Sequence, residues 1–176
     1  MSDIGINAIA YNNAFHTLVI AYSNANIDLI KEGRIINISD IARKQILGNK
    51  TINHIFFVGQ YAYLSCGFGI VVLDIAREEI RDTYYIGKDG SQVNVMAITM
   101  NDQDTLFAAT ARGIYKAWQK EPNLANFAMW KRELKLDTSA TYNAVASFAG
   151  KVFVSKKGGT IPADTIYAYQ SGTWTK

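Results

Sequence analysis

The sequence predicts an all-β fold, a β-propeller of about four four-stranded antiparallel blades. Two observations carry this prediction. The first is a repeated pattern of an apolar residue, an asparagine, a variable residue and a second apolar residue, with its asparagines at Asn7, Asn53, Asn94 and Asn143. Steps of 46, 41 and 49 residues separate them, and strand-rich repeats of about 40 to 50 residues are typical of propeller blades. The second is that short β-branched and aromatic runs, bounded by turn residues, follow each copy.

Four strands are expected in each repeat. First strands end in hairpin turns at residues 12–13, 59–60, 101–104 and 149–150. Second strands are expected at residues 17–22, 61–66, 105–110 and 151–155. Third strands are expected at residues 27–31, 70–75, 114–119 and 165–170. Fourth strands, more polar as a solvated rim requires, are expected at residues 34–38, 81–86, 130–136 and from 173 onward. Helical turns are expected at residues 39–44 and 122–127.

The blade count predicts an incomplete arc of a larger propeller. Closed propellers have about four to eight blades, and closure needs a strand from one terminus to complete the last blade. Only five residues precede Ile6 and four follow Gly172. We expect one propeller fragment over residues 1–176, with blades at about 5–50, 51–91, 92–140 and 141–176. Its end blades would expose apolar faces, so we expect the chain to self-associate.

Composition excludes several classes of protein. The chain has 176 residues, is 49% hydrophobic, and carries a net charge of +3 from 18 basic and 15 acidic residues spread along its length. Such a small, dispersed charge argues against a nucleic-acid partner. The adjacent basic pairs, read as solvated, are Arg43-Lys44, Lys131-Arg132 and Lys156-Lys157. The longest apolar run, residues 17–22, is too short for a membrane span. No targeting signal is visible.

The search for chemistry assigns no catalytic, cofactor-binding or metal-binding residue, and it leaves the ligand-binding residues unknown. His16 and His54 lack partners at metal-ligand spacing, and His54 is expected to be a hydrogen-bonded core histidine. Cys66, the only cysteine, lies in a predicted strand and should be buried. The acidic run at residues 101–104 lacks the glycine and the distant glutamate of a calcium loop, so a hairpin turn is expected.

The repeated asparagines allow two interpretations. First strands line the channel of a propeller, so the asparagines could bind a ligand there. Their recurrence in every predicted blade favours a structural role, in which each asparagine bonds neighbouring backbone. Nucleophile-elbow, phosphate-loop and zinc-helix motifs are missing from the sequence. We therefore expect no enzymatic activity and no cofactor, with a lyase or glycosidase as the remaining enzymatic alternative.

Two stretches carry a resemblance to a known superfamily. Residues 106–115 (LFAATARGIY) and 64–74 (LSCGFGIVVLD) resemble the repeat of the two-component regulator propellers. The opening Ser2-Asp3-Ile4-Gly5-Ile6 is similar to the element that joins one such blade to the next. More narrowly, residues 20–30 and 66–74 resemble the N-terminal propeller of the PorZ-like proteins of Bacteroidetes, although the first blade has Asn24 and Asn26 where the pattern has glycine.

The narrower resemblance implies a non-catalytic scaffold at the outer-membrane surface or in the periplasm, linked to type IX secretion. The resemblance implies protein partners and also a lipopolysaccharide or glycan. The lipopolysaccharide would be involved because such proteins help to deliver lipopolysaccharide-anchored cargo to the cell surface. The second propeller and the C-terminal sorting domain that the resemblance implies are not found in this sequence. The broader resemblance implies an alternative, the periplasmic glycan-sensing propeller of a hybrid two-component regulator.

Overall fold

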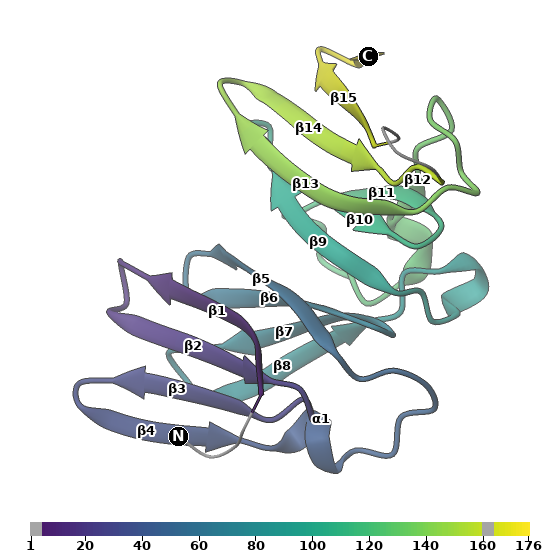
Figure 1. The fold of residues 1–176 in the computed structure, drawn as a ribbon. Helices are drawn as coiled ribbons and strands as arrows, with labels where there is room; N and C mark the ends of the chain where they lie inside the picture. Colours follow the sequence, from purple (N-terminus) through teal and green to yellow (C-terminus); the bar gives the residue numbers. More distant parts are fainter. Residues whose placement is uncertain (1–4, 160–163) are drawn as a thin grey trace.

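The computed structural model describes residues 5–159 and 164–176, and these residues form four antiparallel four-stranded sheets. Each sheet is one blade, with its strands in chain order (Figure 1). Blade 1 has β1 (Ile6–Asn12), β2 (Thr17–Tyr22), β3 (Ile27–Lys31) and β4 (Arg34–Ile38). Blade 2 has β5 (Ile52–Val58), β6 (Tyr61–Cys66), β7 (Gly69–Asp74) and β8 (Glu79–Tyr84). Blade 3 has β9 (Val95–Met100), β10 (Thr105–Thr110), β11 (Gly113–Trp118) and β12 (Lys131–Arg132). Blade 4 has β13 (Tyr142–Phe148), β14 (Lys151–Lys156), β15 (Thr165–Gln170) and β16 (Thr173–Thr175).

The all-β propeller fold predicted from the sequence is confirmed, and most strand bounds agree within one residue. The exceptions are fourth strands. Strand β8 lies two residues before the predicted 81–86. Strand β12 keeps only Lys131–Arg132 of the predicted 130–136. The N–H of Glu133 still donates to the carbonyl of Ile114 at 2.8 Å, and the chain then turns at residues 134–136. The Glu133 side chain accepts hydrogen bonds from Lys116 Nζ at 2.8 Å and from the N–H of Lys135.

The short helical turns agree only in part. Helix α1 (Asp40–Arg43) lies within the predicted segment 39–44. In the predicted segment 122–127, residues 122–125 form a turn in which the N–H of Asn126 donates to the carbonyl of Asn123 at 3.1 Å, and a 3-10 turn, η2 (Phe127–Met129), begins at its last residue. Asn126 sets this start, since its side chain accepts a hydrogen bond from the N–H of Ala128. A second 3-10 turn, η1 (Lys88–Gly90), follows blade 2.

Each first strand contains a β-bulge near its start, where one extra residue stands opposite its second strand. The extra residues are Asn7, Asn53, Met96 and Asn143. The predicted alignment is therefore wrong in the third repeat, where Asn94 lies two residues before the bulge. Both Val93 to Met96 and Val95 to Ile98 begin and end with an apolar residue, and only strand pairing separates them. With Met96 in place, the steps become 46, 43 and 47 residues.

The blades stack through apolar clusters. We call the face of a blade that packs on the following blade its forward face, and the opposite face its backward face. Leu29 of blade 1 packs with Leu64 of blade 2, Val72 of blade 2 with Leu106 of blade 3, and Phe107 of blade 3 with Val154 of blade 4. These side chains are at most 1% exposed, and burial of this kind is the main stabilising term in such a fold.

The four blades form an open arc. Strands β1, β5, β9 and β13 contact one another in that order along the inner side of the arc (Figure 1). Within the described residues, β13 and β1 share no contact of comparable extent. The backward face of blade 1 and the forward face of blade 4 are therefore left without a neighbouring blade. The joining element Ser2-Asp3-Ile4 lies outside the described residues.

Candidate binding site

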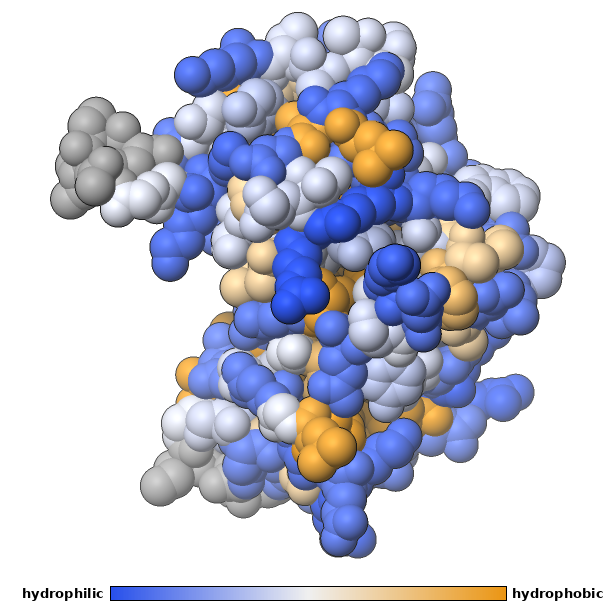
Figure 2. All heavy atoms as spheres, turned by 90° about the vertical axis from the view of Figure 1, so that its right-hand side faces the viewer, coloured by the Kyte–Doolittle hydropathy of each residue, from blue (hydrophilic) through white to orange (hydrophobic). Residues whose placement is uncertain are grey.

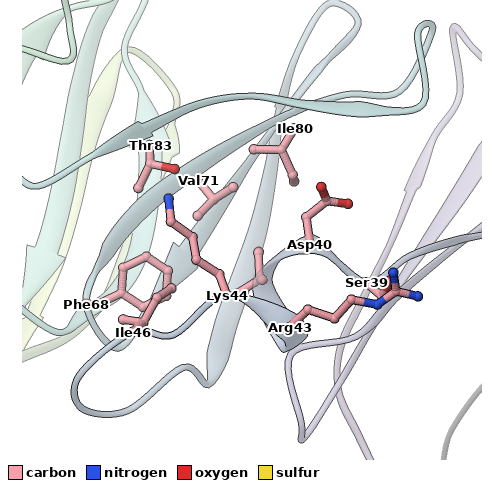
Figure 3. Close-up of a pocket in the computed structure, with 10 residues that line it drawn as sticks. Ser39, Asp40, Arg43, Lys44, Ile46, Phe68, Val71, Ile80 and Thr83 are labelled. Atoms are coloured by element: carbon pink, nitrogen blue, oxygen red, sulfur yellow. The ribbon is translucent and has the colours of Figure 1, made fainter.

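A cavity of about 540 Å³ lies between the segment that follows β4 and the outer strands of blade 2 (Figure 3). Its walls come from two parts of the chain that are distant in sequence. The first part contributes Ser39, Asp40, Ile41, Arg43, Lys44 and Ile46. The second contributes Phe68, Val71, Ile80 and Thr83. We call this space the first rim cavity, because it lies at the outer edge of the arc.

Local structure fixes the first wall. Ile41 is 4% exposed and anchors α1 in the core between blades 1 and 2. The N–H of Arg43 donates to the carbonyl of Ser39 at 2.9 Å, and the Lys50 ammonium donates to the carbonyl of Ala42 at 2.9 Å. A cation at this end of a helix satisfies a free carbonyl. Ile41 thus anchors the short helix in the core, and Lys50 holds its C-terminal end.

The cavity combines an apolar floor with a charged rim. Phe68 is fully buried and packs 6.2 Å from the ring of Tyr85, measured between ring centroids. Arg43 and Lys44 are exposed and form no ion pair within residues 5–159 and 164–176. In Figure 3 the Lys44 side chain extends toward Thr83, while Arg43 points away from the floor toward Ser39. Such a site suits a ligand with both an apolar part and an anionic group.

A second rim cavity, of about 330 Å³, occupies the equivalent place one blade further on. It lies beside η1, η2, Tyr115 and Arg132. Val71 pairs with Thr83 across β7 and β8, and Tyr115 pairs with Arg132 at the same register across β11 and β12. The two cavities are therefore related by the blade repeat.

The second rim cavity is also lined by cations, namely Lys88, Lys131 and Arg132, with the carboxylate of Asp89. Arg132 is already engaged there. Its guanidinium donates to the carbonyls of Arg112 and Thr138 and lies 5.8 Å from the ring centroid of Tyr115. Two of the three basic pairs noted in the sequence thus line the two rim cavities, although the sequence indicated only solvated charges. Figure 2 shows one face of the molecule, on which small hydrophobic patches lie among hydrophilic residues.

The residues singled out in the sequence do not meet at either cavity. Burial lowers the pKa of His54, and its Nδ1 is buried without a hydrogen-bond partner in the described part of the chain. The expectation that His54 is a hydrogen-bonded core histidine is therefore wrong for this atom. His16 lies in the hairpin after β1, with Nδ1 3.2 Å from the Tyr11 hydroxyl. Burial raises the pKa of the Cys66 thiol to about 12, which makes it a poor nucleophile.

The remaining candidates take structural roles. The Asn101 side chain accepts hydrogen bonds from the N–H groups of Gln103 and Thr105 and so closes the predicted hairpin turn. The bulge residues differ in their contacts. Asn53 bonds blade 3, whereas Asn143 donates to Asp164 of its own blade at 3.4 Å. Among the described residues, no helix is long and apolar enough to cross a membrane.

Comparison with solved structures shows the same fold in larger proteins. The extracellular domain of a one-component system, BT4673 of B. thetaiotaomicron, superposes with a TM-score of 0.67 at 10% identity, over 97% of this chain and 22% of that chain. The extracellular domain of the hybrid two-component system BT3049, from the same organism, gives 0.53 at 12% identity, over 99% and 30%. The dihydro-heme d1 dehydrogenase NirN gives 0.68 at 10% identity, over 99% and 37%. This chain therefore spans at most 37% of these three structures.

The sequence comparisons are more specific. No curated protein sequence matches this chain significantly. The profile of the N-terminal β-propeller domain of PorZ, a component of the type IX secretion system, matches residues 1–131, which covers blades 1 and 2 and most of blade 3. With four stacked blades and this match over most of its length, the chain belongs to the family of PorZ N-terminal β-propeller domains.

Proposed function

We propose that this chain is a non-catalytic binding propeller that acts as a scaffold at the outer-membrane surface or in the periplasm. The family match supports a role in type IX secretion. The observation that carries the binding role is the pair of rim cavities on consecutive blades, each of which combines apolar side chains with cations and one carboxylate, Asp40 or Asp89.

The ligand we propose is lipopolysaccharide on its way to cargo at the cell surface. Lipopolysaccharide carries phosphate and sugar groups on acyl chains, so it presents both an anionic and an apolar part. Arg43 and Lys44 would meet the anionic groups, and Ile46, Phe68 and Ile80 would contact the apolar part. Protein partners of the secretion machinery would contact the loops around the rim.

Binding of purified lipopolysaccharide tests this proposal. Titration calorimetry on the 176-residue chain should show binding that weakens as salt rises. Lys44→Glu should lower the affinity roughly tenfold, equivalent to about 1.4 kcal/mol. Lys157→Glu is the matched control, because Lys157 is exposed and lines neither rim cavity. Equal losses in the two variants, or no binding by the unmodified chain, would refute this site.

A second candidate is a periplasmic glycan sensor of a hybrid two-component regulator. It is favoured by the shared fold with the extracellular domains of BT4673 and BT3049. Titration with neutral oligosaccharides separates the two candidates. Binding of neutral glycans that is insensitive to salt and to Lys44→Glu would favour the sensor. Cell fractionation adds a second distinction, because the scaffold belongs at the outer membrane and the sensor at the inner membrane.

A further inference from the structure

Two opposite sides of the arc carry different charge. Neighbouring strands of a blade are antiparallel, and the inner strands β1, β5, β9 and β13 all start on the right-hand side of Figure 1. The segments that join second to third strands, and one blade to the next, therefore lie on that side, which we call the connection face. The segments that join first to second and third to fourth strands start from the opposite side, which we call the hairpin face. Within the described residues, the connection-face segments hold seven basic and five acidic side chains, whereas the hairpin-face segments hold two basic and five acidic ones.

The basic side chains of the connection face are not neutralised by ion pairs. None of the seven lies in an ion pair within the part of the chain that the structure describes. Two of the five carboxylates on this face, Glu133 and Asp137, are paired with lysines of the strands. On the hairpin face both basic side chains, Arg77 and Lys120, lie in ion pairs. The connection face is thus electropositive, although the net charge of the whole chain is only +3.

Two leucines lie on segments of this electropositive face. Leu47, between blades 1 and 2, is 89% exposed, and Leu134, between blades 3 and 4, is 80% exposed. They are the two most exposed large hydrophobic residues in the described part of the chain, and neither belongs to an apolar cluster of the fold. Lys44 and Lys50 lie three residues on either side of Leu47, and Lys135 directly follows Leu134. Figure 2 views this side of the arc and shows small hydrophobic patches among hydrophilic residues.

We propose that the connection face docks on an anionic lipid bilayer. The unpaired basic side chains complement the charge of anionic headgroups, and the two leucines enter the boundary between headgroups and acyl chains. Leu47 and Leu134 belong to different connections, so they do not form the continuous apolar core that a folded protein partner buries. A fluid bilayer accepts such separate apolar side chains. A nucleic acid would attract the cations but would offer the leucines no apolar surroundings.

Docking in this orientation also places the first rim cavity at the lipid surface. Residues 39–46, which form one wall of that cavity, belong to the same connection as Leu47. An amphipathic ligand held in a membrane would therefore meet the cavity directly. The docking itself does not rest on the lipopolysaccharide ligand proposed above, because any anionic bilayer meets its requirements.

Cosedimentation with lipid vesicles tests the proposal. The chain should bind vesicles of phosphatidylcholine mixed with phosphatidylglycerol, should not bind vesicles of phosphatidylcholine alone, and should be released as salt rises. Leu47→Ser and Leu134→Ser should each lower the vesicle partition coefficient about tenfold. Phe148→Ser is the matched control and should leave binding unchanged, because Phe148 is 74% exposed but adjoins the turn at residues 149–150 on the hairpin face. All three side chains are exposed, so circular dichroism should show unchanged folding.

A fluorescent dye reports insertion directly. Cys66 is fully buried, so a thiol-reactive dye should attach at a cysteine introduced on the surface and not at Cys66. The emission of an environment-sensitive dye on the Leu47→Cys variant should shift to the blue when anionic vesicles are added, because the dye leaves water. The same dye on the Phe148→Cys variant should show no shift.

The outcomes separate this docking from the proposed ligand. No binding to the mixed vesicles, equal binding to neutral vesicles, or the same loss in Phe148→Ser as in the two leucine variants would overturn the docking. The vesicles contain no lipopolysaccharide. Loss of vesicle binding with lipopolysaccharide binding intact would therefore refute the docking alone, whereas vesicle binding without lipopolysaccharide binding would support the docking and refute only the proposed ligand.

Discussion

Asn53 on β5 donates its side-chain amide to Oδ1 of Asn94 at 2.9 Å and to the carbonyl of Val95 at 2.7 Å. These two bonds join the bulge of blade 2 to the start of the inner strand of blade 3. Because both acceptors are partly buried, we expect Asn53→Ala to lower the free energy of unfolding by about 1–2 kcal/mol.

Urea denaturation measures this loss, and Asn7→Ala is its control. Asn7 holds the same bulge position in blade 1 but is exposed. We expect that substitution to change the free energy of unfolding by less than about 0.5 kcal/mol. Equal losses at Asn7 and Asn53 would show that the bulge position itself, and not the contact between blades, requires asparagine.

His54 should make stability depend on pH near neutrality. Burial lowers its pKa below the ordinary value of 6.5, so the unfolded chain binds a proton at a higher pH than the folded chain does. Stability should therefore fall as the pH is lowered through about 6.5. Thermal melts from about pH 7.5 to about pH 5.5 should show this trend, and His54→Gln should flatten it. His16→Gln, in the hairpin after β1, should leave the trend unchanged.

Glu133 should make the stability of the fold depend on pH in a more acidic range than His54 does. Burial opposes its ionisation, but hydrogen bonds from the Lys116 ammonium and the Lys135 N–H outweigh burial and hold its pKa below the ordinary value of 4.5. Stability from ionised Glu133 is present above that value and is lost as the pH falls through the lower pKa of the folded chain. Glu133→Gln should cost about 1.5–3 kcal/mol at neutral pH in urea denaturation. Asp104→Asn, which removes the exposed pair with Lys120, should cost less than about 1 kcal/mol.

Gly69 should tolerate no side chain. Its φ of +151° is rarely adopted by other residues, and a Cβ there would overlap the carbonyl oxygen of Tyr84. We expect Gly69→Ala to destabilise the chain by more than about 2 kcal/mol, measured by urea denaturation. Gly33→Ala is the matched control, because Gly33 has a φ of +75° but open space around it. Its cost should be limited to backbone strain of about 1 kcal/mol, and similar losses at both sites would contradict the steric explanation.

The sequence predicted the strands that are buried on both sides. The runs at β2, β6 and β10 are mostly β-branched, aromatic or small, and their predicted bounds match the structure. The fourth strands were less predictable because they pair on one side only. Directly after β12, the Glu133 side chain bonds Lys116 of another strand, and the local sequence does not indicate that contact.

The rim cavities could not be predicted from the sequence, for a similar reason. Lys44 follows blade 1, whereas Thr83 belongs to blade 2, and only stacking of the blades places them in one cavity. The equivalence of Val71 and Tyr115 depends on strand register, which the misaligned Asn94 concealed. The basic pair Arg43-Lys44 was the one visible signal. It became informative only when Lys131-Arg132 was found to line a second cavity, where Arg132 lies on the opposite wall at the register of Thr83.

The linear stacking of the blades also sets the order in which the chain should open. Blade 2 has neighbours on both faces, and every residue of β7 is buried. In β15 of blade 4, by contrast, every residue remains at least partly accessible. Since each blade contacts only the next, stability is shared unevenly along the arc. Thermal unfolding should therefore begin at the outer blades and proceed inward. Hydrogen exchange should show the same order, with the backbone amides of the central blades exchanging last with solvent deuterium.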